Sequence, residues 1–244
     1  VRVSSSQLAD FLQFLRGGAL SPLLKASETV EHKELQAALR KATQGIAKEN
    51  RTAVVRLLGE DDPIIAAGAA RLAGDLQIAE AGPAMTRLFG HGDPDVRLAA
   101  VEAAATLRAS SVAAALVKTL EDPERKLRIA AAKALGALQY RPASKALTGI
   151  VRGRAIRRAD ISEKVAVFEA FGVVADANGL KVLDALLNGR GFLGRREPSD
   201  IRAAAALALG RIAGPEARAV LEKATQDDDP VVRSNVKRAL RHED

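Results

Sequence analysis

The chain has 244 residues, of which 48% are apolar, yet aromatic residues make up only 3% and neither Trp nor Cys occurs. Without Cys, a disulfide framework, a thiolate metal site and a cysteine nucleophile are all excluded. An interior filled by Ala, Leu, Val and Ile instead of aromatic side chains suits closely packed helices and disfavours strands.

The formal net charge is +7, from 37 Lys and Arg against 30 Asp and Glu. This excess favours acidic partners, but it is modest beside the charge density of a dedicated nucleic-acid binder. No run of apolar residues is long enough for a membrane span or a signal peptide. We therefore expect no transmembrane segment and a cytoplasmic location. Because the chain begins at Val1 and not at Met, we also expect it to be an excerpt of a longer protein.

The N-terminal part predicts two helices, over residues 7–15 and 31–46, in which apolar residues recur at helical spacing. We expect them to form an N-terminal helical cap over residues 1–48. A repeat array is expected to follow over residues 49–244, and residues 50–58 are expected to begin its first full hairpin.

A segment of twelve residues recurs six times along the chain. The copies begin at Ile65, Val96, Leu127, Glu163, Ile201 and Val232, so successive starts are 31, 31, 36, 38 and 31 residues apart. The fifth, eighth and ninth positions are apolar in all six copies and the twelfth in the first five, and this spacing predicts one stripe of a helix. Small residues at the fourth, fifth and eighth positions predict that neighbouring helices approach closely.

Two further signals recur with these copies. A Gly stands at the tenth position in four of them, as Gly74, Gly136, Gly172 and Gly210, where it could allow a tight helix crossing or open the last turn. Four copies follow an Asp-Pro pair, which predicts a capped helix start because Asp accepts a hydrogen bond from a free amide and Pro is tolerated in the first turn.

A second apolar segment lies between successive copies, over residues 112–120, 144–151, 180–187 and 215–224. Each repeat is therefore predicted to be a helix, a turn and a second helix. Such a unit cannot bury its apolar faces alone, so stacked neighbours must form the core. The sequence thus predicts an all-α fold, an α-solenoid or superhelix.

The segments Asp93-Pro-Asp-Val-Arg-Leu-Ala-Ala-Val-Glu-Ala-Ala and Asp122-Pro-Glu-Arg-Lys-Leu-Arg-Ile-Ala-Ala-Ala resemble the short bacterial HEAT repeats, the type also found in phycobilin lyases. The resemblance covers roughly residues 50 to 241. It implies an armadillo-like superhelix of about six HEAT-like helical hairpins. For function it implies a surface that binds other macromolecules, because arrays of this kind carry chemistry only occasionally.

No group of residues predicts catalysis or a bound metal. The three His residues, His32, His91 and His242, are scattered, and no Ser-His-Asp or Cys-His arrangement can be assembled. HEAT-like deoxyhypusine hydroxylases bind iron through repeated His-Glu pairs, whereas this chain has one such pair at its end. We therefore expect a protein that is not an enzyme and that has no cofactor.

Two repeats are longer than the others, and each extra length falls between the two helices of a hairpin. The first insertion contains Arg152, Arg154, Arg157 and Arg158, and the second contains Arg190, Phe192, Arg195 and Arg196. Equivalent loops of neighbouring repeats emerge on the same edge, so these residues predict one basic edge that binds an anionic partner. The alternative is a pair of solvated loops that charge keeps soluble.

A second basic series is interpreted as structural. The second position of the copies holds Arg97, Arg128, Lys164, Arg202 and Arg233, and acidic residues are interleaved with them at Asp95, Glu124, Glu163, Asp200 and Asp229. This alternation predicts a ladder of ion pairs between repeats, each contributing only about 0–1 kcal/mol where it is exposed.

These observations favour a non-catalytic scaffold for protein–protein interaction with an acidic or anionic partner. One alternative is a nucleic-acid-binding protein that uses the basic edge, for which the scarcity of aromatic residues is unfavourable. Another is a phycobilin-lyase-like enzyme or enzyme subunit. The residues do not identify the partner, the oligomeric state, or whether the concave face or the basic edge is the binding surface.

Overall fold

A computed structural model describes residues 15–107, 110–190 and 194–241. Within these residues the chain consists of α-helices, short 3-10 helices and their connections, without a strand. The helix predicted over residues 7–15 lies outside the described residues, except for Leu15. The chain separates into two compact units, residues 1–116 and 117–244.

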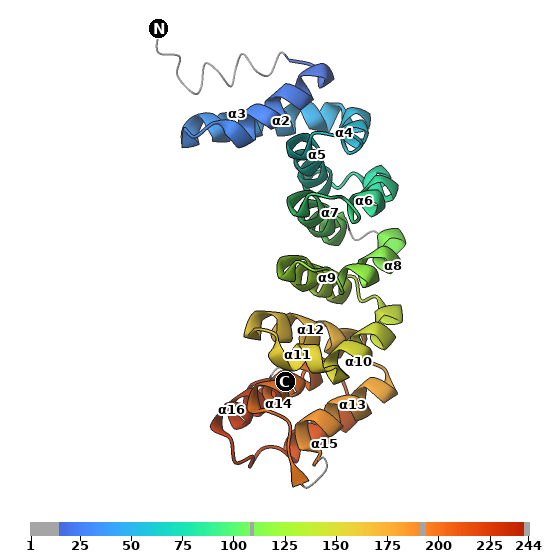
Figure 1. Cartoon of the computed structure of the whole chain (residues 1–244), viewed down its shortest axis with the longest axis vertical. Coiled ribbons are helices and arrows are strands. Elements are labelled where there is room, and N and C mark those ends of the chain that lie inside the picture. The colour runs from blue at the N-terminus through green and yellow to red at the C-terminus, as the bar shows by residue number, and fades with distance from the viewer. Residues whose placement is uncertain (1–14, 108–109, 191–193, 242–244) are drawn as a thin grey trace. The chain divides into compact units, whose positions relative to one another are not determined.

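The first unit begins with a helical pair that packs against the first hairpin (Figure 1). The helix α2 contacts both α3 and α5, and α5 packs along α7. Its elements are η1 (Gly17–Ala19), α2 (Leu20–Thr29), α3 (Lys33–Glu49), α4 (Arg51–Leu57), α5 (Pro63–Asp75), η2 (Ala79–Ala81), α6 (Gly82–Leu88) and α7 (Pro94–Leu107), and α8 (Ser110–Thr119) begins in this unit and ends in the second. The expected boundary between residues 48 and 49 falls at the end of α3 and stays a prediction.

In the second unit the helices α9, α12, α14 and α16 pack one on the next in that order (Figure 1). The elements are α9 (Arg125–Ala137), η3 (Arg141–Ala143), α10 (Ser144–Arg152), α11 (Arg154–Arg158), α12 (Ile161–Val174), α13 (Ala177–Asn188), α14 (Ser199–Leu209), α15 (Pro215–Glu222) and α16 (Pro230–Arg241). Counted over the described residues of both units, the six predicted hairpins are α4/α5, α6/α7, α8/α9, α10/α12, α13/α14 and α15/α16. The all-α solenoid is confirmed.

The helix α2 was not predicted from the sequence. Its buried side chains are Leu20, Leu23, Leu24 and Ser27, which follow the helical spacing. Pro22, the third residue of α2, obscured that pattern, although Pro is tolerated in a first turn because the amide there has no helical partner.

Aspartate side chains fix the starts of α5, α7 and α16, as predicted. The prediction is wrong for the pair Asp122-Pro123, because α9 begins only at Arg125 and its N-cap residue Glu124 accepts no capping hydrogen bond through its side chain. The carboxylate of Asp62 accepts a hydrogen bond from the Ile64 amide, with Pro63 as the first residue of α5. The Asp93 carboxylate likewise accepts from the Asp95 amide at the start of α7. Each cap satisfies an amide that has no partner inside its helix, so the register of the helix is set by its own sequence.

Glycine permits the close crossing of successive repeated helices. A Cβ atom at Gly172 of α12 would lie 2.2 Å from the carbonyl oxygen of Ala208 on α14. At Gly210 of α14 it would lie 2.8 Å from the Cβ of Ala239 on α16. The tenth-position Gly of one copy therefore lies on the eighth-position Ala of the next. Of the two roles predicted for this Gly, the structure shows the tight helix crossing and not the opened last turn.

This contact predicts that Gly172→Ala destabilises the protein by about 1–3 kcal/mol, because the added methyl group must push α12 and α14 apart. The control is Gly149→Ala in α10, where no atom lies within 4 Å of an added Cβ. That change should stabilise the protein by about 0.5–1 kcal/mol, since Ala restricts the unfolded chain. Thermal unfolding followed by circular dichroism measures both, and equal melting temperatures for the two variants would contradict the packing role.

Candidate functional site at the arginine-rich insertions

The first insertion is partly helical and not a simple loop. Between α10 and α12 the chain forms the short helix α11, and Figure 1 shows it beside both of them. Ile156 of α11 is only 2% exposed, so an apolar side chain fixes this turn to the second unit. The expectation of a plain connecting loop is corrected here, because Ile156 gives the insertion a buried anchor.

Arg157 of α11 joins the two insertions. Its Nε and Nη2 atoms donate hydrogen bonds of 2.9 and 2.5 Å to the two carboxylate oxygens of Glu197, in the second insertion. Its Nη1 atom donates to the carbonyl oxygens of Arg152 and Gly153. The hydrogen bond to Glu197 raises the pKa of Arg157 above its ordinary value. This arginine therefore holds the insertions together and has little capacity left for a partner.

The same arrangement recurs in the ladder predicted for the second position of the repeats. Arg128 of α9 donates through Nε and Nη2 to Glu163 of α12, and through Nη1 to the carbonyl oxygens of Asp122 and Pro123. Its pKa is raised, chiefly by the hydrogen bond to Glu163. The inter-repeat ladder is thus confirmed for the pairs Arg128–Glu163 and Lys164–Asp200.

The sequence does carry a signal for the structural role of Arg157. In most copies the ladder arginine follows a buried apolar residue at the start of the repeated helix. The pairs are Val96-Arg97, Leu127-Arg128, Ile201-Arg202 and Val232-Arg233, and Ile156-Arg157 repeats them outside the 31-residue register. The pair was overlooked because the insertion was compared with loops and not with the repeat itself.

Arg196 of the second insertion is also bound within the protein. It donates to the carboxylate of Asp227, which accepts from Arg202 of α14 as well. The Asp227 side chain is fully buried. Because a buried carboxylate needs compensating charge, Arg196 and Arg202 stabilise the connection between α15 and α16. Sequence reasoning missed Glu197 and Asp227, the two acids that bind these arginines.

The remaining five arginines of the insertions are exposed. Within the part of the chain that the structure describes, no hydrogen bond or ion pair engages their side chains, which are those of Arg152, Arg154, Arg158, Arg190 and Arg195. Phe192, expected to supply an apolar contact, lies outside the described residues. The predicted cluster is thus divided between two structural arginines and five that face solvent.

The arginines at the end of α10 and in α11 line two different hollows of the second unit. Arg152 and Arg157 line a small hollow of about 340 Å³ together with Lys181 and Glu197. Arg154 and Arg158, one helical turn apart, line a wider groove of about 1250 Å³. The groove is bounded by the end of α8, the turn before α9, one face of α10, and α11. The insertions therefore do not present all their arginines to one surface.

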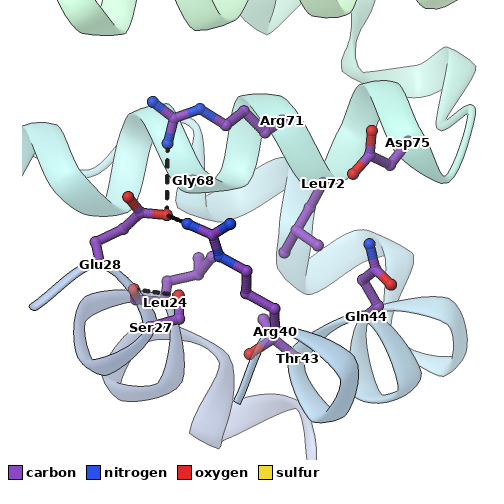
Figure 2. A pocket seen from close by; sticks show the side chains of 10 residues that line it. All are labelled: Leu24, Ser27, Glu28, Arg40, Thr43, Gln44, Gly68, Arg71, Leu72 and Asp75. Carbon is purple, nitrogen blue, oxygen red and sulfur yellow. Dashed lines mark hydrogen bonds and ion pairs between the residues drawn. The ribbon is translucent and has the colours of Figure 1, made fainter. Parts of the chain in front are cut away.

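A third hollow lies in the first unit, between α2, α3 and α5, and has a volume of about 380 Å³ (Figure 2). Figure 2 shows Arg40 and Arg71 converging on one oxygen of Glu28, at 3.5 and 3.8 Å. Three of the charged groups at this hollow, those of Glu28, Arg40 and Arg71, thus bind one another and tie three helices together. The groove of the second unit differs, since its cations at Arg154 and Arg158 have no such partner among the described residues.

Two further findings concern metal ions and membranes. Within the described residues, no three His, Asp or Glu side chains are grouped so that they could hold a metal ion. Across the same residues, every helix is too short or too polar to cross a bilayer.

Stacked helical hairpins of about 31 residues, linked by an arginine ladder, define an α-solenoid of the repeat class. A family model for HEAT repeats matches residues 83–166 and 154–241, which together make up more than half of the chain. The protein belongs to the HEAT-repeat family, as the sequence resemblance implied, and it is a helical repeat scaffold.

Solved structures show the same fold. The complex of CpcE and CpcF of phycocyanin lyase from Nostoc sp. PCC7120 is similar over 76% of this chain and 73% of that chain, with 20% identity and a TM-score of 0.55. A crystal structure of an engineered protein is similar over 78% of this chain and 96% of that chain, with 22% identity and a TM-score of 0.52. At these identities the likeness concerns the fold alone. No curated protein matches the sequence.

Neighbouring arginines of the second insertion should differ sharply in their effect on stability. Arg196→Ala removes a charged hydrogen bond from the buried Asp227 and should lower the free energy of unfolding by about 1.5–3 kcal/mol. Arg195→Ala, at an exposed position, should change it by less than about 0.5 kcal/mol. Urea denaturation of the two variants measures this difference, and a similar loss in both would contradict the division into structural and solvent-facing arginines.

Acid should destabilise the second unit through its bound carboxylates. The amide of Glu163, followed by Arg125, lowers the pKa of Asp160 below its ordinary 3.8. Burial opposes the change at Asp227, but the amide of Asp229 and the guanidinium groups of Arg202 and Arg196 outweigh it and lower that pKa too. Such carboxyls bind fewer protons in the folded chain than in the unfolded one, so their stabilisation is complete above the unfolded pKa and is lost as the pH falls through the folded pKa.

We therefore expect a melting temperature that is nearly constant between about pH 5 and 7 and that falls below about pH 4. Asp227→Asn should melt lower at neutral pH and lose less on acidification, because it lacks one of the groups that must be protonated. Thermal melts over a pH series test both statements. A melting temperature that rises on acidification would show that these carboxylates do not stabilise the fold.

Proposed function

We propose that this protein is a non-catalytic HEAT-repeat scaffold that binds an acidic protein partner through the arginine-rich insertions of the second unit. One observation carries the proposal: the Arg157–Glu197 pair holds the two insertions together while five other arginines of the same insertions stay exposed without an ion pair among the described residues. Guanidinium groups suit carboxylates because they can donate two parallel hydrogen bonds.

The electrostatic repulsion between the exposed cations of the site supports this proposal. Exposed like charges that are close together repel one another and gain nothing for the fold, whereas the ladder arginines each have an acidic or carbonyl partner. Arg154, Arg158 and Lys145 line the same groove, and none of them has an ion pair among the described residues. An acidic partner would relieve this repulsion when it binds.

Nucleic acid is the weaker candidate. Proteins that bind single strands stack bases on aromatic side chains, and only 3% of this chain is aromatic. Double-stranded DNA would instead be bound through its phosphates, with an affinity that falls steeply with salt. A lyase role receives support from the likeness to the CpcE and CpcF complex only at the level of the fold, and the described residues offer no acid-base or nucleophilic cluster in either hollow of the second unit.

The experiment compares the parent chain with one variant of the whole chain in binding a fluorescein-labelled polyglutamate peptide. Changing Arg152, Arg154, Arg158, Arg190 and Arg195 together to Ala should weaken binding by at least about tenfold, since each arginine removed from the site lowers its attraction for carboxylates. The melting temperature should stay close to that of the parent, because these exposed side chains make no hydrogen bond or ion pair among the described residues.

A labelled DNA duplex serves as the competing probe. Tighter binding of the duplex than of the peptide, with a linear fall of log affinity against log salt, would favour the nucleic-acid function instead. Unchanged peptide binding by the five-arginine variant would contradict the proposal and move the search to the concave face of the repeats.

A further inference from the structure

We infer that the groove between the turn before α9 and the helices α10 and α11 is the docking site for an acidic, amphipathic segment of the partner protein, whose apolar side chains enter the groove while its carboxylates bind Lys145, Arg154 and Arg158. The inference rests on the proposed function, since it assumes that the insertions bind an acidic protein. It adds that one groove, and not the whole arginine-rich surface, is the part that recognises the partner.

The first support is the apolar lining of the groove. One face of α10 and its leading turn contributes residues at helical spacing, and the end of α8 and α11 contribute the rest. The larger apolar lining residues are Val117, Leu120, Pro142, Ala146, Ile150 and Ile156, of which Leu120 and Ile156 are buried and form the floor of the groove. The adjacent face of α10 buries Leu147 and Val151 in the core, so the apolar stripe of this helix is wider than the part that the core covers. Such a surface gains stability when an apolar side chain covers it.

The second support is the shape of α10. Its groove face carries the small residues Ala146 and Gly149, and no atom lies within 4 Å of a Cβ built on Gly149. A glycine in a helix interior costs about 0.5–1 kcal/mol relative to alanine. At Gly149 no close contact with a neighbouring helix explains the glycine, unlike at Gly172. The empty space above it is where an incoming side chain would fit.

The third support is charge complementarity. Lys145 comes from α10, and Arg154 and Arg158 come from the same face of α11, so that three cations border the groove. Arg128 and Glu163, which also line it, neutralise one another. Glu121 is the one exposed acid in the lining, whereas Asp122 is half-buried and its carboxylate accepts a hydrogen bond from the Glu124 amide. The unpaired charge at the groove is therefore mainly positive.

Size and chemistry favour a peptide over other occupants. The groove volume of about 1250 Å³ exceeds the roughly 300–1,000 Å³ of ordinary small-molecule sites. Among the described residues that line it, none is aromatic, so a nucleic-acid base would find no side chain to stack on. Apolar side chains flanked by carboxylates match both parts of the lining, in the manner of an amphipathic helix bound in a groove.

The experiment uses the full chain and a fluorescein-labelled amphipathic peptide of Glu and Leu, beside a second peptide in which every Leu is replaced by Ser. Gly149→Leu should fill the groove without disturbing the fold, because its surroundings are empty. Its matched control is Gly45→Leu in α3, a helix glycine that is equally open and belongs to the other unit. We expect the Gly149 variant to bind the Glu and Leu peptide at least about tenfold more weakly than the Gly45 variant does.

A second pair of variants tests the charges. Arg154→Ala with Arg158→Ala should weaken binding of the amphipathic peptide at least about fivefold more than Arg190→Ala with Arg195→Ala, which changes exposed arginines outside the groove lining. The parent should also bind the peptide with Leu more tightly than the one with Ser, since only the former covers the apolar lining.

The outcomes separate the inference from the function on which it rests. If the Arg190 and Arg195 pair carries the binding while Gly149→Leu has no effect, the acidic partner stands and the groove is overturned as its docking site. If neither pair of arginines affects either peptide, both are overturned. Equal affinity for the Leu and Ser peptides would likewise overturn the groove, because it would show attraction by charge alone.

Discussion

The close contact between successive repeated helices is the constraint on which the rest of the structure depends. Where Gly172 of α12 lies on Ala208 of α14, and Gly210 of α14 lies on Ala239 of α16, the backbones meet with almost no side chain between them. Interiors packed in this way tolerate little added volume. In the second unit the spacing of these helices is therefore fixed, and the residues at the starts of α12, α14 and α16 recur at a constant distance along the stack.

That fixed spacing explains why the ladder works. Lys164 at the start of α12 meets Asp200 at the start of α14, and Arg128 of α9 meets Glu163. Lys164 and Glu163 are both buried. Each ion pair therefore avoids the free-energy cost of burying a charge without a counter-charge. The insertions extend the same scheme, since Arg157 binds Glu197 and Arg196 binds Asp227. Some basic residues of the second unit thus hold its helices together, and others stay exposed to solvent. The number of basic residues alone does not distinguish these two groups.

The division has a consequence for binding. Arginines that hold the fold together are bound to carboxylates or carbonyl groups, whereas Arg154 and Arg158 on α11 border a groove that the fold leaves open. Ile156 lies between these two arginines in the sequence, and its buried side chain keeps α11 in place. Binding groups held by a rigid support lose less freedom when a partner arrives, and Ile156 gives Arg154 and Arg158 such a support. The hollow in the first unit lacks this property, because Glu28 already binds its two arginines.

The sequence by itself determined the features that depend on neighbours along the chain: the helical period, the Asp caps, the 31-residue repeat and the glycines of the crossings. It determined two pairs of the ladder too, Arg128–Glu163 and Lys164–Asp200, because equal spacing brings equal positions together, whereas Arg202 binds Asp227, which the sequence did not indicate. Only the tertiary structure decided which arginines of the insertions are bound, since Glu197 is 40 residues from Arg157 and Asp227 is 31 residues from Arg196. It also decided that Arg154 and Arg158 share a groove with Lys145, because a charge acts on what is near it in space and the sequence orders residues only along the chain.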